Sequence, residues 1–313
     1  MVVHNGARAA LPSDGKTLPE TARPGGFSGE RALTYLRAQC AFGPRVPGTR
    51  AHEDCADYLK RELSKWADEV QEQRFLAAVG QANIALTNLI AVIRPSKAGT
   101  QSPPSPPATW AMVCAHWDSR PTADQEADAA SRAHPVPGAN DGASGTAVVL
   151  ELARALASAR PPCAVLLVLF DGEDYGPGVD RMFLGSRHFA KEYHGPRPAW
   201  GVLLDMVGGR NLEISREGYS RERAPSVVRR IWSVAGALKA RAFVDRDGDR
   251  LMDDHLPLLD AGIPCINLVD MSYPYWHTVS DTPDKCSPAS LQSVGDVLLA
   301  ALLGAQTEAS PVR

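Results

Sequence analysis

Several features that mark common classes of protein are missing from this 313-residue sequence. Its 33 basic and 36 acidic residues leave a formal net charge of -3, so it lacks the basic field that nucleic-acid binding needs. It also lacks a basic amphipathic stripe for a membrane surface and any apolar run long enough to span a membrane. The six cysteines include no CxxC pair and do not make a disulfide framework. We therefore expect neither a nucleic-acid nor a membrane partner, and the sequence indicates no oligomeric state.

The amino terminus shows no basic start followed by an apolar stretch, so we expect no signal peptide and a soluble, cytoplasmic protein. The alternative is an exported protein whose signal is hidden by a wrongly chosen start codon. Residues 1–27 are rich in Pro, Gly, Ala and charge and are predicted to be a disordered tail. With 44% hydrophobic residues, 28–305 are predicted to form a single domain, and 306–313 a carboxyl-terminal tail. The Pro/Ser-rich segment 97–108 is predicted to be a surface loop.

Strand-like and helix-like segments alternate along the domain. Apolar runs predict strands at 69–75, 85–93, 110–115, 165–170, 200–207 and 263–269. Helical spacing of apolar residues predicts helices at 28–36, 51–66, 144–159, 185–193, 226–239 and 288–303. This alternation predicts an α/β fold with one mixed or mostly parallel sheet that carries helices on both faces.

The most informative stretch is the apolar run 165–170, which stops abruptly at acids and glycines. The run has no polar alternation, so it predicts an interior strand covered on both faces. In open α/β sheets, ligand chemistry collects at the carboxyl ends of such strands. Glu173 and Asp174 stand side by side at that point, where their mutual repulsion is costly unless a cation lies nearby.

Other acids and histidines follow strands or lie in glycine-rich turns. They are His116 with Asp118, Asp141, Asp205, Asp254 with His255, and His277. Each has an ordinary alternative when taken alone: His116 as a core histidine, Asp141 as a helix N-cap, Asp205 as a strand-end acid. Together at one edge of a sheet they would repel one another without a cation. Imidazole and carboxylate ligands without thiolate suit zinc in an open catalytic site.

The order of these motifs resembles that of zinc peptidase family M28. The resemblance runs from about Ser28 to Leu303 and rests on His116-Trp-Asp118, Asp141-Gly, Glu173-Asp174, Leu-Asp205-Met and His277-Thr. The family comprises co-catalytic zinc aminopeptidases and the related glutaminyl cyclases of animals. The resemblance implies a three-layer α/β/α sandwich with a central mixed, mostly parallel sheet of the phosphorylase/hydrolase-like type.

The resemblance also assigns roles. It implies a set of zinc ligands shared by both branches, namely Asp141, Asp174 and His277, and a proton-transferring acid, Glu173. In the aminopeptidases, the counterparts of His116 and Asp205 bind a second zinc ion. In the cyclases one zinc ion is bound, and the counterpart of Asp205 is a hydrogen-bond partner of the catalytic acid.

The neighbours of these residues favour the cyclase branch. Asp253 stands where aminopeptidases usually carry Ser, and it is expected to join Glu173 and Asp205 in an acid network. Trp276 and Tyr273 are expected to wall the pocket for a glutamine side chain. Two positions depart from the animal cyclases, because Asp174 replaces the usual Glu and Asn267 replaces a His, and Thr282 belongs to a peptidase-like ending.

The sequence thus predicts a zinc-dependent glutaminyl-peptide cyclotransferase, which converts the N-terminal glutamine of peptides or proteins to pyroglutamate and releases ammonia. The alternative is a di-zinc aminopeptidase of the M28 type. A third hypothesis, a zinc-binding protein that has lost catalysis, is disfavoured because the chain retains Glu173, which would not be a ligand.

Overall fold

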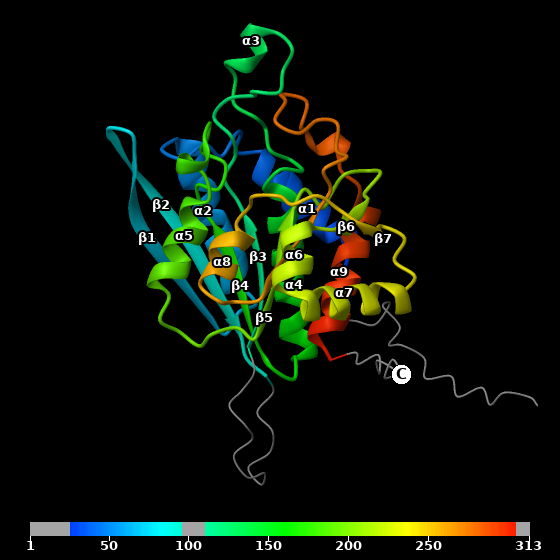
Figure 1. Cartoon of the computed structure of the whole chain (residues 1–313). Coiled ribbons are helices and arrows are strands. Elements are labelled where there is room, and N and C mark those ends of the chain that lie inside the picture. Colours follow the sequence, from blue (N-terminus) through cyan, green and yellow to red (C-terminus); the bar gives the residue numbers. More distant parts are fainter. Residues whose placement is uncertain (1–25, 96–109, 305–313) are drawn as a thin grey trace, which may run out of the picture.

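The computed structural model describes residues 26–95 and 110–304 (Figure 1). Its central sheet has six strands in the order β1-β2-β4-β3-β5-β8. The strands are β1 (Glu69–Val79), β2 (Ala82–Ile93), β3 (Trp110–His116), β4 (Ala164–Phe170), β5 (Trp200–Asp205) and β8 (Cys265–Val269). β4, β3, β5 and β8 are mutually parallel, whereas β1 and β2 form an antiparallel hairpin that joins β4 in antiparallel register. The predicted mixed, mostly parallel sheet is confirmed.

Helices cover both faces of this sheet. Alternate strand residues such as Leu167 and Leu169 pack in a core with helices of one face, whereas Leu166 and Val168 pack in a second core that includes Phe189. The helices of the first face are α1 (Gly29–Cys40), α2 (Arg50–Ser64), α4 (Ala143–Ala159), α7 (Pro225–Ala237) and α9 (Pro288–Leu302). Those of the second face are α5 (Leu184–Glu192) and α8 (His255–Asp260). The three-layer α/β/α sandwich is confirmed.

Short elements were not predicted from the sequence. They are α3 (Ala129–Arg132), β6 (Ile214–Arg216), α6 (Gly218–Arg223), β7 (Phe243–Asp247), α8, and the 3₁₀ turns η1 (Val179–Arg181) and η2 (Pro283–Lys285). β6 and β7 pair in parallel as a small second sheet. Elements this short lack the repeated apolar spacing on which a prediction from sequence depends.

The ordered domain begins earlier than the composition indicated. Phe27, which was assigned to the tail, is only 4% exposed and packs against Gly295 of α9. The prediction was wrong at this residue because a single aromatic anchor does not change the composition of a segment rich in Pro, Gly and charge. Residues 1–25 of the predicted tail, the segment 97–108 and the predicted carboxyl-terminal tail lie outside the described residues.

The parallel strands bring distant parts of the chain to one edge. β3, β4 and β5 end at the same edge, and the loop that carries α3 rises above it at the top of Figure 1. This edge holds the ends of the apolar runs that are followed by acids and histidines in the sequence. Within the described residues, no helix is long and apolar enough to cross a membrane.

Candidate metal centre

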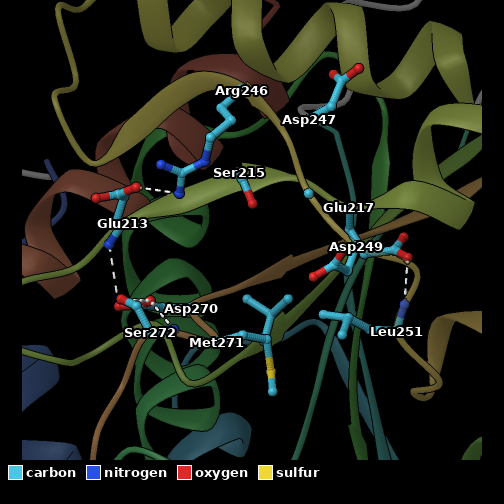
Figure 2. Close-up of a pocket in the computed structure, with 12 residues that line it drawn as sticks. Glu213, Ser215, Glu217, Arg246, Asp247, Asp249, Leu251, Asp270, Met271 and Ser272 are labelled. Carbon is cyan, nitrogen blue, oxygen red and sulfur yellow. Dashed lines mark hydrogen bonds and ion pairs between the residues drawn. The ribbon is translucent and has the colours of Figure 1, made fainter.

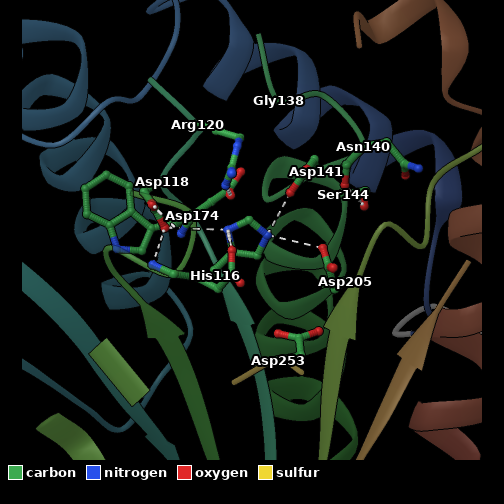
Figure 3. Close-up of polar contacts among 12 residues, drawn as sticks. His116, Asp118, Arg120, Gly138, Asn140, Asp141, Ser144, Asp174, Asp205 and Asp253 are labelled. Atoms are coloured by element: carbon green, nitrogen blue, oxygen red, sulfur yellow. Dashed lines mark hydrogen bonds and ion pairs between the residues drawn. The ribbon is translucent and has the colours of Figure 1, made fainter. Parts of the chain in front are cut away.

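The candidate ligands meet at the carboxyl edge of the sheet. His116 is the last residue of β3 and Asp205 the last of β5, while Glu173 and Asp174 follow β4. Asp141 precedes α4, whose N-cap is Gly142 with φ +89°, so Asp141 does not serve as the cap. Figure 3 shows one ring nitrogen of His116 facing both Asp141 and Asp205.

We name the first group of ligands the His277 cluster, which consists of Asp141, Asp174 and His277. One ligand atom from each of the three lies within 4.8 Å of the others. Nε2 of His277 is 3.5 Å from Oδ1 of Asp174 and 3.6 Å from Oδ2 of Asp141. The backbone of His277 has φ +54°, an unfavourable conformation for a residue with a side chain. The loop therefore holds this imidazole in place at a conformational cost.

The oxygens of the His277 cluster show why a cation fits there. No hydrogen-bond donor among the described residues reaches Oδ2 of Asp141 or Oδ2 of Asp174, although both atoms are buried. A buried carboxylate oxygen without a partner costs free energy, and a divalent ion removes that cost. Two carboxylates and one imidazole, with no thiolate, are ligands that zinc accepts in an open site. The residues present therefore fit a zinc ion.

The second group, the His116 cluster, consists of His116, Asp141 and Asp205 and also has ligand atoms within 4.8 Å. Here Nε2 of His116 lies 3.1 Å from Oδ1 of Asp141 and 3.2 Å from Oδ1 of Asp205. Burial lowers the pKa of His116, but interactions with Asp118, Asp141 and Asp205 outweigh it and raise this pKa well above its usual value. The imidazole thus partners the carboxylates of its own cluster, and Asp141 belongs to both clusters.

Glu173 belongs to neither cluster but lies beside both. It is 7% exposed, and its Oε2 is 3.8 Å from Nδ1 of His116. Burial raises the pKa of Glu173 well above its usual range; His116 opposes this shift, while Asp174 and Asp253 add to it. The carboxylate of Asp118 accepts the backbone N–H groups of Glu173 and Asp174, each at 3.1 Å. Asp118 therefore holds the turn that presents these two acids and is not a member of either cluster.

Asp253 interacts electrostatically with both Glu173 and Asp205; it is buried, whereas Asp205 is partly buried. Burial raises the pKa of Asp205 to about 7 and also raises the pKa of Asp253. Nδ2 of Asn267 donates to Oδ2 of Asp253 at 2.6 Å, which fixes the orientation of this carboxylate. Of the other predicted candidates, Asp254 accepts the hydroxyl of Ser186 at 2.5 Å. His255 forms an ion pair with Glu217 at 3.2 Å. Asp254 and His255 therefore both lie outside the two clusters.

The two predicted aromatic residues have different surroundings. The ring of Trp276 is half-buried, with its centroid 4.1 Å from that of the His277 ring. Tyr273 is 7% exposed, and its hydroxyl donates to Asp281 at 2.7 Å. Asp281 in turn accepts the backbone N–H of Asp141 at 3.1 Å. The substrate-binding role stays a prediction for both, and the hydroxyl of Tyr273 is engaged in supporting the Asp141 turn.

Three residues of the site were missed by sequence reasoning, namely Arg120, Asp124 and Asp281. Arg120 is 4% exposed and forms an ion pair with Asp174, and Asp124 pairs with Nδ1 of His277 at 3.0 Å. The only signal that pointed to the first two was the unusual length of the polar loop after β3. Nothing in the residues around Asp281 distinguished it from a surface acid.

A concavity of about 310 Å³ lies beside β6 and β7 and has several acids in its lining (Figure 2). Glu213 forms an ion pair with Arg246, and Asp270 accepts the backbone N–H of Glu213 at 3.2 Å. Glu217 accepts the backbone N–H groups of Ser220 and Leu251. These three acids already have partners within the protein, so this concavity lacks the unpartnered carboxylate oxygens that mark the His277 cluster.

Comparison with known proteins gives consistent matches. The model of peptidase family M28 matches residues 88–302. The glutaminyl-peptide cyclotransferase of Drosophila melanogaster is 26% identical over 288 residues, which cover 82% of this chain and 75% of that protein. Aminopeptidase YwaD of Bacillus subtilis is 30% identical over 206 residues, which cover 61% of this chain and 40% of that protein. The crystal structure of Fimbriiglobus ruber glutaminyl cyclase superposes with a TM-score of 0.81 at 35% identity, covering 95% of this chain and 99% of that one.

Proposed function

Because the chain belongs to peptidase family M28, we propose that it is a zinc-dependent glutaminyl-peptide cyclotransferase. It converts the N-terminal glutamine of a peptide or protein to pyroglutamate and releases ammonia. The observation that carries this proposal is a group of three acids beside the unpartnered oxygens of the His277 cluster, in which Glu173 and Asp253 are buried and Asp205 is partly buried. The similarity to F. ruber glutaminyl cyclase over nearly the whole of both chains supports it.

The His277 cluster is the proposed site of one zinc ion. Its ligands are Asp141, Asp174 and His277, whose metal-facing atoms are close together and partly unpartnered. When bound there, zinc supplies Lewis-acid polarisation of the γ-amide carbonyl. In the His116 cluster the imidazole already partners both carboxylates, which favours a hydrogen-bonding role for His116 and Asp205.

Glu173 is the proposed proton carrier of the reaction. The α-amine of the substrate attacks the carbonyl carbon of its own γ-amide, so a C–N bond forms in the ring and the bond to the amide nitrogen breaks. Glu173 accepts the proton that the α-amine loses and returns it to the departing ammonia. Burial and the neighbouring acids raise the pKa of Glu173, which favours the protonated form needed for the second transfer.

Trp276 is the proposed wall of the glutamine pocket. Its half-buried ring lies against the imidazole of His277, so an apolar surface borders the proposed metal ligand. The methylene groups of a glutamine side chain can pack on such a ring while the amide points toward the metal ligands. Tyr273 is the proposed support of this wall, because Trp276 packs against the apolar cluster that contains Tyr273, whose hydroxyl donates to Asp281.

A di-zinc aminopeptidase is the second candidate function. The His116 cluster favours it, because His116, Asp141 and Asp205 have ligand atoms within 4.8 Å of one another and share Asp141 with the first cluster. The similarity to aminopeptidase YwaD supports the same alternative. In that reaction Glu173 deprotonates a water molecule that attacks a peptide bond.

Two assays on one zinc-loaded preparation separate these functions. Ammonia release is followed with Gln-peptides, and peptide-bond hydrolysis with Leu- and Ala-anilides. A Gln-peptide with an acetylated α-amine is the matched control, since it cannot cyclise. We expect ammonia release from the free peptide alone. Anilide hydrolysis without ammonia release would establish the peptidase, and turnover of neither substrate would leave a zinc-binding protein without catalysis.

A further inference from the structure

The long loop between β3 and α4 is held closed by a buried arginine. Arg45 is fully buried, and its guanidinium donates to the backbone carbonyl oxygens of Trp117 at 3.2 Å, Pro137 at 2.5 Å and Gly138 at 2.6 Å. These carbonyls come from the two ends of the loop 119–137. One side chain therefore fixes where the loop begins and ends, so the residues between them have a defined position above the site.

Within this loop, Arg120 reaches one of the proposed metal ligands. Its Nη1 donates to Oδ1 of Asp174, and its Nη2 and Nε donate to Oδ2 of Asp124 at 2.7 and 3.2 Å. The other oxygen of Asp124 is 3.0 Å from Nδ1 of His277. The chain of contacts Asp174–Arg120–Asp124–His277 thus joins two members of the His277 cluster through a single guanidinium.

The same loop also supports the backbone beside His277. The N–H of Gln125 donates to the carbonyl oxygen of His277 at 3.2 Å. The carboxylate of Glu126 accepts the N–H of Val279 at 3.0 Å. These contacts flank a residue whose φ of +54° needs support from its surroundings. Side-chain and main-chain contacts of the loop therefore act on the same ligand.

Gly176 leaves the space that the guanidinium of Arg120 occupies. A Cβ atom at this position would lie 2.7 Å from Nη1, 2.8 Å from Nη2 and 2.9 Å from Cζ of Arg120. Gly176 is not among the glycines with positive φ, so the requirement for glycine here is one of space. Alanine at 176 would therefore displace Arg120 without removing any charged group.

We propose that Arg120 is a positioning residue of the metal centre. Its planar fork holds Asp174 on one side and, through Asp124, His277 on the other, so Oδ1 of Asp174 is engaged while Oδ2 has no partner among the described residues. Guanidinium geometry suits this task because its donors lie in a fixed plane, which an ammonium group cannot reproduce. Partners of this kind, one contact away from the metal, orient the ligands and tune the ion. The proposal rests on the proposed zinc site and is independent of the reaction catalysed there.

The experiment measures metal binding without any substrate. Zinc transfer to a competing chromophoric chelator gives the affinity of the wild type and of Arg120→Gln, Arg120→Lys and Gly176→Ala. Arg132→Gln is the matched control, because Arg132 lies exposed in the same loop. We expect roughly 10- to 100-fold weaker zinc binding in the first three variants and no change in the control. Circular dichroism and thermal unfolding of the metal-free proteins check that each variant folds.

The Co²⁺-substituted proteins report how Asp174 binds. Without Arg120, Asp174 is free to offer both oxygens, so we expect a higher coordination number and weaker visible absorption in Arg120→Gln. We also expect the double variant Gly176→Ala/Arg120→Gln to be no weaker than the poorer single variant, because both changes remove the same contact.

Three results would overturn the proposal. The first is unchanged zinc affinity and Co²⁺ spectrum in Arg120→Gln. The second is full rescue by Arg120→Lys, which would mean that positive charge alone matters. The third is additive loss in the double variant. All three are read from metal binding, so the absence of cyclase activity in the wild type would refute the proposed reaction and leave this proposal intact.

Discussion

The His277 cluster and the His116 cluster lie side by side and share Asp141, yet their unpaired atoms differ. In the His277 cluster, Oδ2 of Asp141 and Oδ2 of Asp174 have no donor among the described residues. In the His116 cluster, Nε2 of His116 lies within 3.2 Å of a carboxylate oxygen of both acids. A cation is therefore needed to satisfy the first cluster, whereas an imidazole satisfies the carboxylates of the second.

The residues that contact the two clusters also differ. Asp124 holds His277 and Arg120 holds Asp174, while Asp281 holds the turn of Asp141. The His116 cluster instead includes Asp205 and borders Glu173, and neither of these acids has an arginine partner among the described residues. The comparison is the basis for proposing that one cluster orients metal ligands and that the other takes part in proton transfer.

The largest expected effect is the loss of a proposed ligand that belongs to the His277 cluster alone. His277→Ala should abolish turnover and weaken zinc binding by more than the roughly 10- to 100-fold typical of residues one contact away from a metal. Asp205→Asn, in the second cluster, should keep the bound zinc while turnover falls. Metal analysis after gel filtration checks both. Equal zinc loss in the two variants would erase the distinction between the clusters.

Next in size is the removal of the proposed proton carrier. Glu173→Gln preserves the shape of the side chain but cannot accept a proton, so ammonia release should fall by roughly 10²- to 10⁴-fold. Zinc content should equal that of the wild type, because Glu173 belongs to neither cluster. Loss of zinc in this variant would show that Glu173 and Asp174 have exchanged roles.

A smaller effect is expected at the acid that distinguishes the two proposed reactions. Asp253→Ser removes the partner of Asn267 and one of the carboxylates that raise the pKa of Glu173. We expect cyclisation to fall by about tenfold or more, as for a loss of about 1.4 kcal/mol in the transition state. Asp249→Ser, at an exposed acid in the same segment, is the control. Anilide hydrolysis with an unchanged kcat/KM in Asp253→Ser would argue for the aminopeptidase.

The smallest effect concerns stability. Zinc bound to the folded protein at about 100 times its Kd should stabilise it by about 2.7 kcal/mol, which a chelator removes. For a chain of this size we expect the Tm to fall by several degrees, and to fall little in His277→Ala. Differential scanning calorimetry with and without chelator checks this. An equal decrease in both proteins would locate the stabilising ion outside the His277 cluster.

Much of this architecture could be read from the sequence. Long apolar runs that end in acids gave β3, β4 and β5, and the parallel arrangement of these strands brings His116, Asp174 and Asp205 to one edge. Spacing carries such information because a buried strand or helix repeats its pattern over many residues.

The supporting residues could not be found in this way. Whether Arg120 meets Asp174 depends on the path of an irregular loop, which the buried side chain of Arg45 fixes from a distant part of the chain. Asp281 is similar, because its partners Asn140 and Tyr273 become neighbours only in the folded protein. Sequence patterns therefore indicated the candidate ligands, and tertiary contacts were needed to show how these side chains are oriented.

Anomalous diffraction at the zinc edge, on crystals of zinc-loaded protein, tests the central claim most directly. The account predicts one strong peak per chain, between Oδ2 of Asp141, Oδ2 of Asp174 and Nε2 of His277. Two peaks of similar height, the second between His116 and Asp205, would contradict it and establish a di-zinc centre.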